Sequence, residues 1–271
     1  MGVPEAAELL DLALSVVRPA AELARSMRSA GIPEFSTKTT DTDVVTAADR
    51  AVERQVIAAL RAVRPADAIL GEESGALPGT DGGAGAVRWI LDPIDGTVNY
   101  LYGLPGYAVS LAAEVDGVVL AGVVHNAATG QEWTALRGGG AYRGGRRLTG
   151  SRVTELGQAL LATGFGYDPA RRAHQGRVLA GLLPEVRDLR RMGAAALDLC
   201  LAAEGSVDVY YEKGLQLWDH AAGGLVAAEA GLRVTGLAGA PPGADFVLAA
   251  PPALYQALHD RLLRLDAAGG P

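Results

Sequence analysis

The sequence predicts an α/β (α+β) fold, and three observations lead to this class. Apolar residues recur with helical spacing near the N-terminus, glycine-punctuated strand-like runs follow in the middle, and the second half alternates strands with helices. The alternation lacks a regular βαβ order, and no internal repeat or long linker divides the chain. We therefore expect an α+β or layered α/β architecture.

The N-terminal region predicts two helices. Apolar residues recur at helical spacing over residues 6–27, and Pro19 should kink or split this helix. Residues 34–45 are polar and aperiodic, which predicts a loop or a loose hairpin. Thr46 and Asp49 then fit a capping box at the start of the second helix. Its apolar face consists of Val52, Val56, Ala59, Leu60 and Val63.

Strand-like runs dominate the middle of the chain. Two short buried strands are predicted at residues 68–70 and 87–91, with a glycine-rich surface loop at residues 74–86 between them. Apolar runs punctuated by glycine over residues 106–148 predict an antiparallel meander. The second half predicts strands at residues 160–163, 186–190, 207–211 and 246–249, and helices at residues 170–183, 193–204, 219–230 and 252–265.

Length and charge restrict the domain organisation and the ligands. A chain of 271 residues can bury a large core. We expect one domain over residues 1–271, with an α+β half of about 1–150 and an α/β half of about 151–271. The net charge of −7 argues against a nucleic-acid partner. An anionic substrate would need bound cations to reverse the local sign.

The N-terminus and the cysteine content indicate a cytoplasmic protein. The first residues lack the basic region and long apolar run of a signal peptide, and no stretch reaches the length of a membrane span. Cys200 is the single cysteine, so no internal disulfide can form. We expect a cytoplasmic location without a membrane partner.

Three segments place carboxylates at a strand end or a helix start: residues 71–74 (GEES), 92–97 (DPIDGT) and 218–223 (WDHAAG). Pro93 and Gly96 predict a tight turn that aims Asp92 and Asp95 at one point. Carboxylate and backbone oxygens are ligands that suit Mg²⁺. Each segment alone has an ordinary explanation, as a strand-end loop, a β-turn or a helix cap. Their joint occurrence favours a shared metal site.

The two segments 92–97 and 218–223 resemble the two signatures of the inositol monophosphatase family. The resemblance includes residues 71–74, 43–49 and 210–212, and it extends from residue 5 to about 262. It implies a layered αβαβα sandwich, also found in fructose-1,6-bisphosphatases. It further implies a homodimer, dependence on two or three Mg²⁺ ions per active site, and inhibition by lithium.

The family's site roles transfer to individual positions of this chain. The implied metal ligands are Glu72, Asp92, the Ile94 carbonyl, Asp95 and Asp219. The implied catalytic residues, which position and deprotonate the attacking water, are Glu72, Asp49 and Thr97. The implied substrate-binding residues are Gly96 and Thr97 through their amides, together with Ala195, Glu212, Asp95 and Asp219.

Several candidate residues have competing explanations. A capping box alone would account for Thr46 and Asp49. In the family, the loop with Lys38 and Asp43 closes over a third metal, but a solvated loop explains these residues equally well. The arginine pairs 171–172 and 190–191 could steer anions or form solvated faces. Packing explains Cys200, Trp89 and Trp218, and the histidines at 125, 174, 220 and 259 lack metal-ligand spacing.

These features predict a phosphatase that acts on a phosphate monoester of inositol or a related polyol. Glu212 favours a hydroxyl-rich ligand because a carboxylate accepts hydrogen bonds from vicinal hydroxyls. Histidinol phosphate, fructose 1,6-bisphosphate and adenosine 3',5'-bisphosphate are alternative substrates. A non-catalytic, metal-binding regulatory protein is a further alternative, against which the intact ligand set argues.

Overall fold

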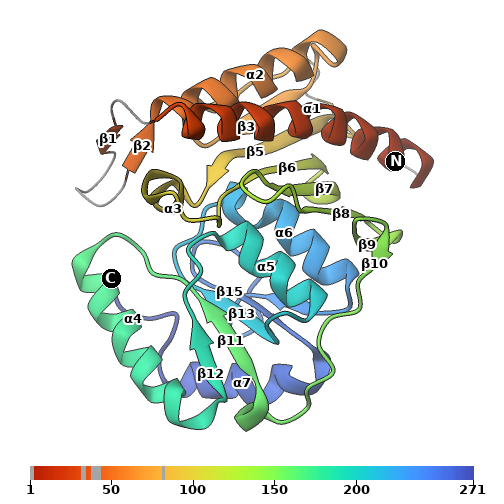
Figure 1. Cartoon of the computed structure of the whole chain (residues 1–271). Coiled ribbons are helices and arrows are strands. Elements are labelled where there is room, and N and C mark those ends of the chain that lie inside the picture. Colours follow the sequence, from red (N-terminus) through yellow and green to blue (C-terminus); the bar gives the residue numbers. More distant parts are fainter. Residues whose placement is uncertain (1–2, 32–34, 38–43, 81–82) are drawn as a thin grey trace.

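The computed structural model describes residues 3–31, 35–37, 44–80 and 83–271. Helices and sheets alternate in five layers (Figure 1), which confirms the expected αβαβα sandwich. An eight-stranded and a five-stranded sheet form the two β layers. The helical layers contain α1 (Val3–Ser29) with α2 (Ala47–Val63), α5 (Ala195–Glu204) with α6 (Leu217–Glu229), and α4 (Pro169–Leu182) with α7 (Pro252–Arg264).

The eight-stranded sheet comes from the first half of the chain, in the order β10-β9-β8-β7-β6-β5-β3-β4. Its strands are β3 (Ala68–Gly71), β4 (Gly75–Leu77), β5 (Val87–Asp95), β6 (Ala108–Val115), β7 (Val118–Asn126), β8 (Glu132–Leu136), β9 (Gly140–Arg143) and β10 (Arg146–Arg147). The strands from β6 to β10 form the antiparallel meander predicted over residues 106–148, and β5 pairs antiparallel with β6 but parallel with β3. The loop predicted at 74–86 contains β4, which pairs with β3.

The five-stranded sheet comes from the second half, in the order β12-β11-β13-β15-β14. Its strands are β11 (Leu160–Thr163), β12 (Asp188–Arg190), β13 (Val209–Glu212), β14 (Arg233–Thr235) and β15 (Val247–Ala250). Strand β11 is parallel to β12 and β13, and β15 is antiparallel to β13 and β14. The four predicted strands are present within a few residues. Strand β14 was not predicted because three residues are too short to show a periodic pattern.

Helix α1 runs through Pro19 as one helix, so the expected split is wrong. Val16, Val17, Ala20 and Ala21 around the proline are all buried against the rest of the N-terminal core. Packing of this apolar stripe offsets the one backbone hydrogen bond that proline cannot donate.

Two elements join α1 to the first sheet as the sequence predicted. Strands β1 (Phe35–Thr37) and β2 (Val44–Thr46) pair antiparallel, which is the loose hairpin. The capping box at the start of α2 is present: the Thr46 hydroxyl accepts from the Ala48 amide, and the Asp49 carboxylate accepts from the Thr46 amide at 2.8 Å.

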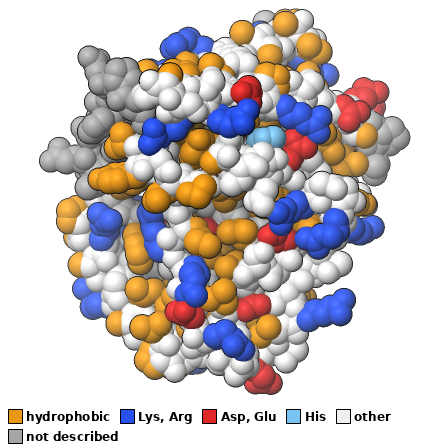
Figure 2. Space-filling view, in the orientation of Figure 1, with side chains coloured by type: hydrophobic (Ala, Val, Ile, Leu, Met, Phe, Trp, Pro, Cys, Tyr) orange, Lys and Arg blue, Asp and Glu red, His pale blue; other side chains and the backbone are white. Residues whose placement is uncertain are grey.

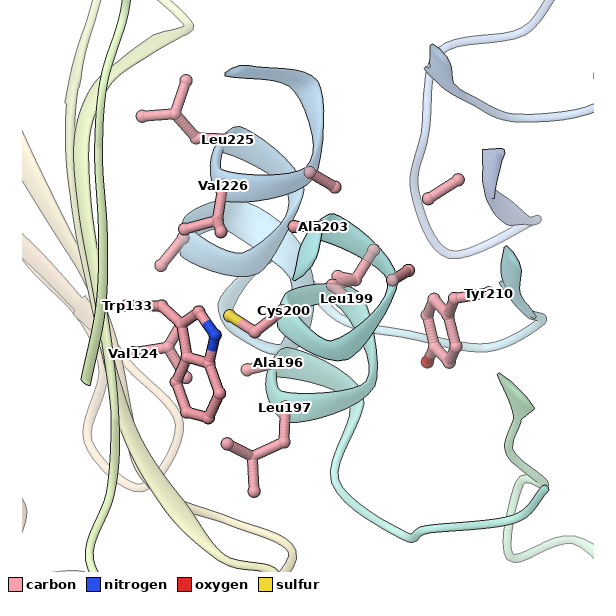
Figure 3. Close-up of a cluster of buried hydrophobic side chains, with 14 of the residues drawn as sticks. Val124, Trp133, Ala196, Leu197, Leu199, Cys200, Ala203, Tyr210, Leu225 and Val226 are labelled. Atoms are coloured by element: carbon pink, nitrogen blue, oxygen red, sulfur yellow. The ribbon is translucent and has the colours of Figure 1, made fainter. Parts of the chain in front are cut away.

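The central helices are packed closely by small residues. A Cβ atom on Gly122 of β7 would lie 3.1 Å from the Cα of Ala222, and one on Gly223 would lie 2.9 Å from the Ala196 carbonyl oxygen. Helix α6 therefore packs closely against both the first sheet and its neighbour α5. Figure 3 shows the resulting core, in which Cys200 is buried as predicted.

The surface is mixed in character. On the face drawn in Figure 2, basic and acidic side chains are interspersed among apolar ones. Within the described part of the chain, every helix falls short of the length and apolarity that crossing a membrane requires.

Candidate active site

A cavity of about 590 Å³ lies where the two halves of the chain meet. The ends of β3, β5 and β13 reach it, as do the starts of α5, α6 and the short helix α3 (Thr97–Tyr102). The predicted site residues that line it are Glu72, Asp92, Ile94, Asp95, Gly96, Thr97, Ala195, Glu212 and Asp219. The fold thus gathers on one surface three motifs that lie far apart in the sequence.

Glu72 and Asp92 are neighbours because their strands are parallel. Gly71 of β3 is opposite Leu91 of β5, and the Glu72 amide donates to the Leu91 carbonyl at 3.2 Å. The carboxyl ends of two parallel strands meet at the same sheet edge. Glu72 follows Gly71, and Asp92 follows Leu91, so both carboxyl groups reach the cavity at this edge. The two side chains are hydrogen-bonded to each other.

Glu53 supports this turn and was missed by the sequence analysis. Its side chain is 3% exposed and accepts a hydrogen bond from the Glu73 amide at 2.9 Å. A Cβ atom at position 71 would lie 2.7 Å from the Glu53 carboxylate, so Gly71 leaves room for it. The available signal was an acidic residue one helical turn after Asp49, on the buried face of α2.

The predicted tight turn at Asp92–Gly96 is wrong in one respect. Strand β5 continues to Asp95, and its pairing with β6 shifts register between Asp92 and Asp95. In a regular strand, residues three apart point to opposite faces. The irregularity, at a proline that cannot donate to the ladder, lets both carboxylates face the cavity. Gly96 then turns the chain with φ of 88° into α3.

Thr97 and Asp49 form the expected pair, although α3 itself was not predicted. The Thr97 hydroxyl lies 3.2 Å from Asp49 Oδ1 and 3.1 Å from the Ile94 carbonyl oxygen. The other oxygen of Asp49 accepts from the amide and hydroxyl of Thr46. Asp49 therefore caps α2 through one oxygen and accepts a hydrogen bond from Thr97 through the other.

Asp95 joins the two halves of the chain. Its Oδ1 accepts from the Ala195 amide at 3.1 Å, and its Oδ2 accepts from the Ala196 amide at 2.8 Å. These are first-turn amides of α5, which have no partner within their own helix. The Ala195 amide is thus engaged by Asp95 at the wall of the cavity.

Asp219 reaches the cavity from the first turn of α6. Its Oδ2 accepts from the Gln216 amide at 2.6 Å, which makes it part of a helix cap as well. Trp218 beside it is partly buried against the central core and also lines the cavity, so its predicted packing role is present together with a place in the site.

Burial and mutual repulsion disfavour the charged forms of these carboxyl groups. Burial, followed by the charges of the neighbouring carboxylates, raises the pKa values of Asp92 and Asp219 well above their ordinary range. Burial raises the pKa of Asp95 to about 7 against the opposing effect of the two α5 amides. It raises the pKa of Glu212 to about 7 as well, against hydrogen bonding by Tyr210 and the charge of Arg191.

The donor set fits a hard divalent cation. Carboxylate and carbonyl oxygens line one wall, and bound cations would relieve the repulsion between them. Among the described residues, no three His, Cys, Asp or Glu side chains already form a metal-binding group. Asp95 and Asp219 also accept hydrogen bonds from backbone amides.

Residues outside this group have varied positions. Lys38 and Asp43 lie outside the described residues. Among the described residues, the four histidines all lie outside the lining of the cavity. Burial lowers the pKa of His220 to about 4. Arg171 and Arg191 do line it, whereas Arg190 pairs with Asp188 at the surface.

Comparisons with known proteins show the family of this chain. The model of the inositol monophosphatase family matches residues 5–265. The chain is 46% identical to an inositol-1-monophosphatase of Mycobacterium leprae over 245 residues, which is 88% of this chain and 84% of the relative. It is 40% identical to a protein named Nus factor SuhB of Pseudomonas aeruginosa over 235 residues, 85% of this chain and 86% of that protein.

Among solved structures, Mycobacterium tuberculosis SuhB is similar with a TM-score of 0.82 and 41% identity, covering 97% of this chain and 98% of the other. Sequence and fold therefore agree: this chain belongs to the inositol monophosphatase family, a family of phosphoric monoester hydrolases.

Proposed function

We propose that this chain is a Mg²⁺-dependent phosphatase that hydrolyses a phosphate monoester of inositol or a related polyol. The observation that carries the proposal is the convergence of Glu72, Asp92, Asp95, Asp219 and Glu212 on one cavity. Relatives named inositol-1-monophosphatase support the substrate class.

The proposed metal ligands are Glu72, Asp92, the Ile94 carbonyl, Asp95 and Asp219. When bound, two Mg²⁺ ions would activate the attacking water and stabilise the leaving oxygen, and a third would bind more weakly near Glu72. A carboxylate has about four lone-pair sites, so Asp95 and Asp219 could ligate a metal while keeping their amide contacts. Lithium inhibition belongs to the same proposal.

The remaining roles belong to the chain's own groups. Thr97, held by Asp49, would orient the attacking water, and Glu72 would accept its proton. The amides of Gly96 and Thr97 would bind phosphate oxygens at the start of α3. Ala195 and Glu212 would contact the polyol hydroxyls, with Asp95 and Asp219 beside them. We further propose that the two halves act as one domain, in a cytoplasmic homodimer.

Phosphate release tests the proposal. Purified protein is assayed with inositol 1-phosphate, histidinol phosphate, fructose 1,6-bisphosphate and adenosine 3',5'-bisphosphate, each with MgCl₂ and with excess EDTA. We expect turnover only with magnesium and fastest on the inositol ester. Full turnover in excess EDTA would contradict the metal dependence.

A regulatory role is the second candidate, because relatives at 38–40% identity carry the name Nus factor SuhB. The presence of all the proposed ligands, with Thr97 and Asp49 paired, favours the enzyme. Absence of phosphate release from every ester, in a folded protein with magnesium, would favour the regulatory role.

A further inference from the structure

Strand β13 ends with two adjacent buried tyrosines followed by Glu212. Successive side chains of a strand point to opposite faces, so Tyr210 and Glu212 share one face and Tyr211 lies on the other. Tyr210 is 0% exposed in the core around α5, where Figure 3 shows it on the side of the helix away from Trp133. Tyr211 is buried in the separate core beneath α7.

The Tyr210 hydroxyl donates a hydrogen bond of 2.6 Å to Glu212 Oε2. Within the described ranges it is the one hydrogen-bond donor to this carboxylate. The adjacent ammonium group of Lys213 is engaged elsewhere, because it donates to the Ala268 and Gly269 carbonyls at 2.8 and 2.7 Å. The orientation of Glu212 therefore depends on one phenol.

Gly164 leaves the space that the Glu212 carboxylate occupies. A Cβ atom at this position would lie 1.9 Å from Glu212 Oε2 and 2.4 Å from Oε1, so any side chain here would displace the group. Gly164 and Glu212 both line the cavity. The Glu212 carboxylate is thus held between the Tyr210 hydroxyl and the backbone of Gly164.

We propose that Tyr210 is a positioning residue for substrate selection: by holding Oε2 of Glu212, it keeps Oε1 as the acceptor for a hydroxyl of the substrate. This inference rests on the proposed function, in which Glu212 contacts the polyol. It names the substrate class more closely as a phosphate ester with a hydroxyl within reach of that single oxygen. An ester without hydroxyls gains nothing from the arrangement.

The variant Tyr210→Phe tests this inference, with Tyr211→Phe as the matched control. Both changes remove a buried hydroxyl from β13, since Tyr211 is hydrogen-bonded to Thr163. For Tyr210→Phe we expect KM for inositol 1-phosphate to rise about tenfold while kcat changes little. With p-nitrophenyl phosphate, and for Tyr211→Phe with either ester, KM should remain near the wild-type value.

A second arm tests whether Tyr210 acts through Glu212. In the Glu212→Ala background, Tyr210→Phe should raise KM by less than about twofold, because the acceptor that Tyr210 orients is gone. Equal KM changes for both esters, or a full additional loss in the Glu212→Ala background, would overturn the inference.

The wild-type enzyme separates this inference from the proposed function. If it hydrolyses p-nitrophenyl phosphate but no polyol ester, the proposed substrate class fails and this inference fails with it. If it hydrolyses inositol 1-phosphate and Tyr210→Phe leaves KM unchanged, the inference alone is overturned.

Discussion

The Asp95 carboxylate accepts a hydrogen bond of 2.8 Å from the Ala196 amide, across 101 residues of sequence. The contact joins the end of β5 to the first turn of α5. A carboxylate at a helix N-terminus is stabilised by the unpaired amides and by the helix dipole. Asp95 therefore holds the two halves of the cavity together as well as standing among the proposed metal ligands.

Asp92→Asn should reduce kcat by about 100-fold or more, yet raise the melting temperature measured in EDTA. Asp92 is 2% exposed among other carboxylates, so removing its charge relieves repulsion in the metal-free fold while removing a proposed metal ligand. Phosphate release and thermal melting check both parts. Asp11→Asn, at an exposed position, is the control. Wild-type turnover by the Asp92→Asn variant would show that Asp92 is not a required metal ligand.

Magnesium should stabilise the fold. A ligand that binds only the native state adds about 2.7 kcal/mol at one hundred times its Kd. In a domain of this size, each kcal/mol of stabilisation raises the melting temperature by about 2–4 °C. Melting against MgCl₂ at fixed ionic strength measures the effect, and Asp219→Asn should weaken it. A wild-type melting temperature indifferent to magnesium would show that these carboxylates share no metal site.

Glu53→Ala should lower stability by about 1–3 kcal/mol, because the part-buried Glu73 amide loses its acceptor. It should also raise the magnesium concentration for half-maximal activity, since Glu53 supports the turn that carries Glu72. Glu53→Gln should restore much of both, because its carbonyl can accept the same bond. Arg54→Ala, exposed on the same helix, is the control. A Glu53→Ala enzyme with wild-type magnesium dependence would restrict Glu53 to a purely structural role.

Glu132 should contribute stability that disappears in acid. Burial alone would raise its pKa, but hydrogen bonds from His125 and Arg18 outweigh burial and lower the pKa from 4.5 to about 2. A depressed carboxyl pKa stabilises the fold above the unfolded value, and the benefit is lost as pH falls from 4.5 towards about 2.

Urea unfolding of the wild type and of Glu132→Gln should therefore differ more at pH 6 than at pH 3. Glu22→Gln removes the exposed partner of Arg25 and should show a small difference at both pH values. A Glu132→Gln difference that is the same at both pH values would contradict the assigned pKa.

The sequence alone determined most of the local structure of this protein. The capping box at Thr46 and Asp49, the helical stripes and the strand meander depend on neighbouring residues, so their patterns are visible in the chain. The three carboxylate motifs are also local, and their combination indicated the family that the comparisons show. Pro19 is one exception, because burial of α1 outweighed a local helix-breaking signal.

Only the tertiary structure decided how these motifs combine into a site. The register shift that turns both Asp92 and Asp95 to the cavity depends on pairing with β6. The position of the Glu212 carboxylate depends on the space left by Gly164 in another segment. Glu53 has a role only because α2 packs beside the end of β3. Such contacts join residues distant in sequence, and their hydrogen bonds and packing exist only after the layers have assembled, so local propensity has no information about them.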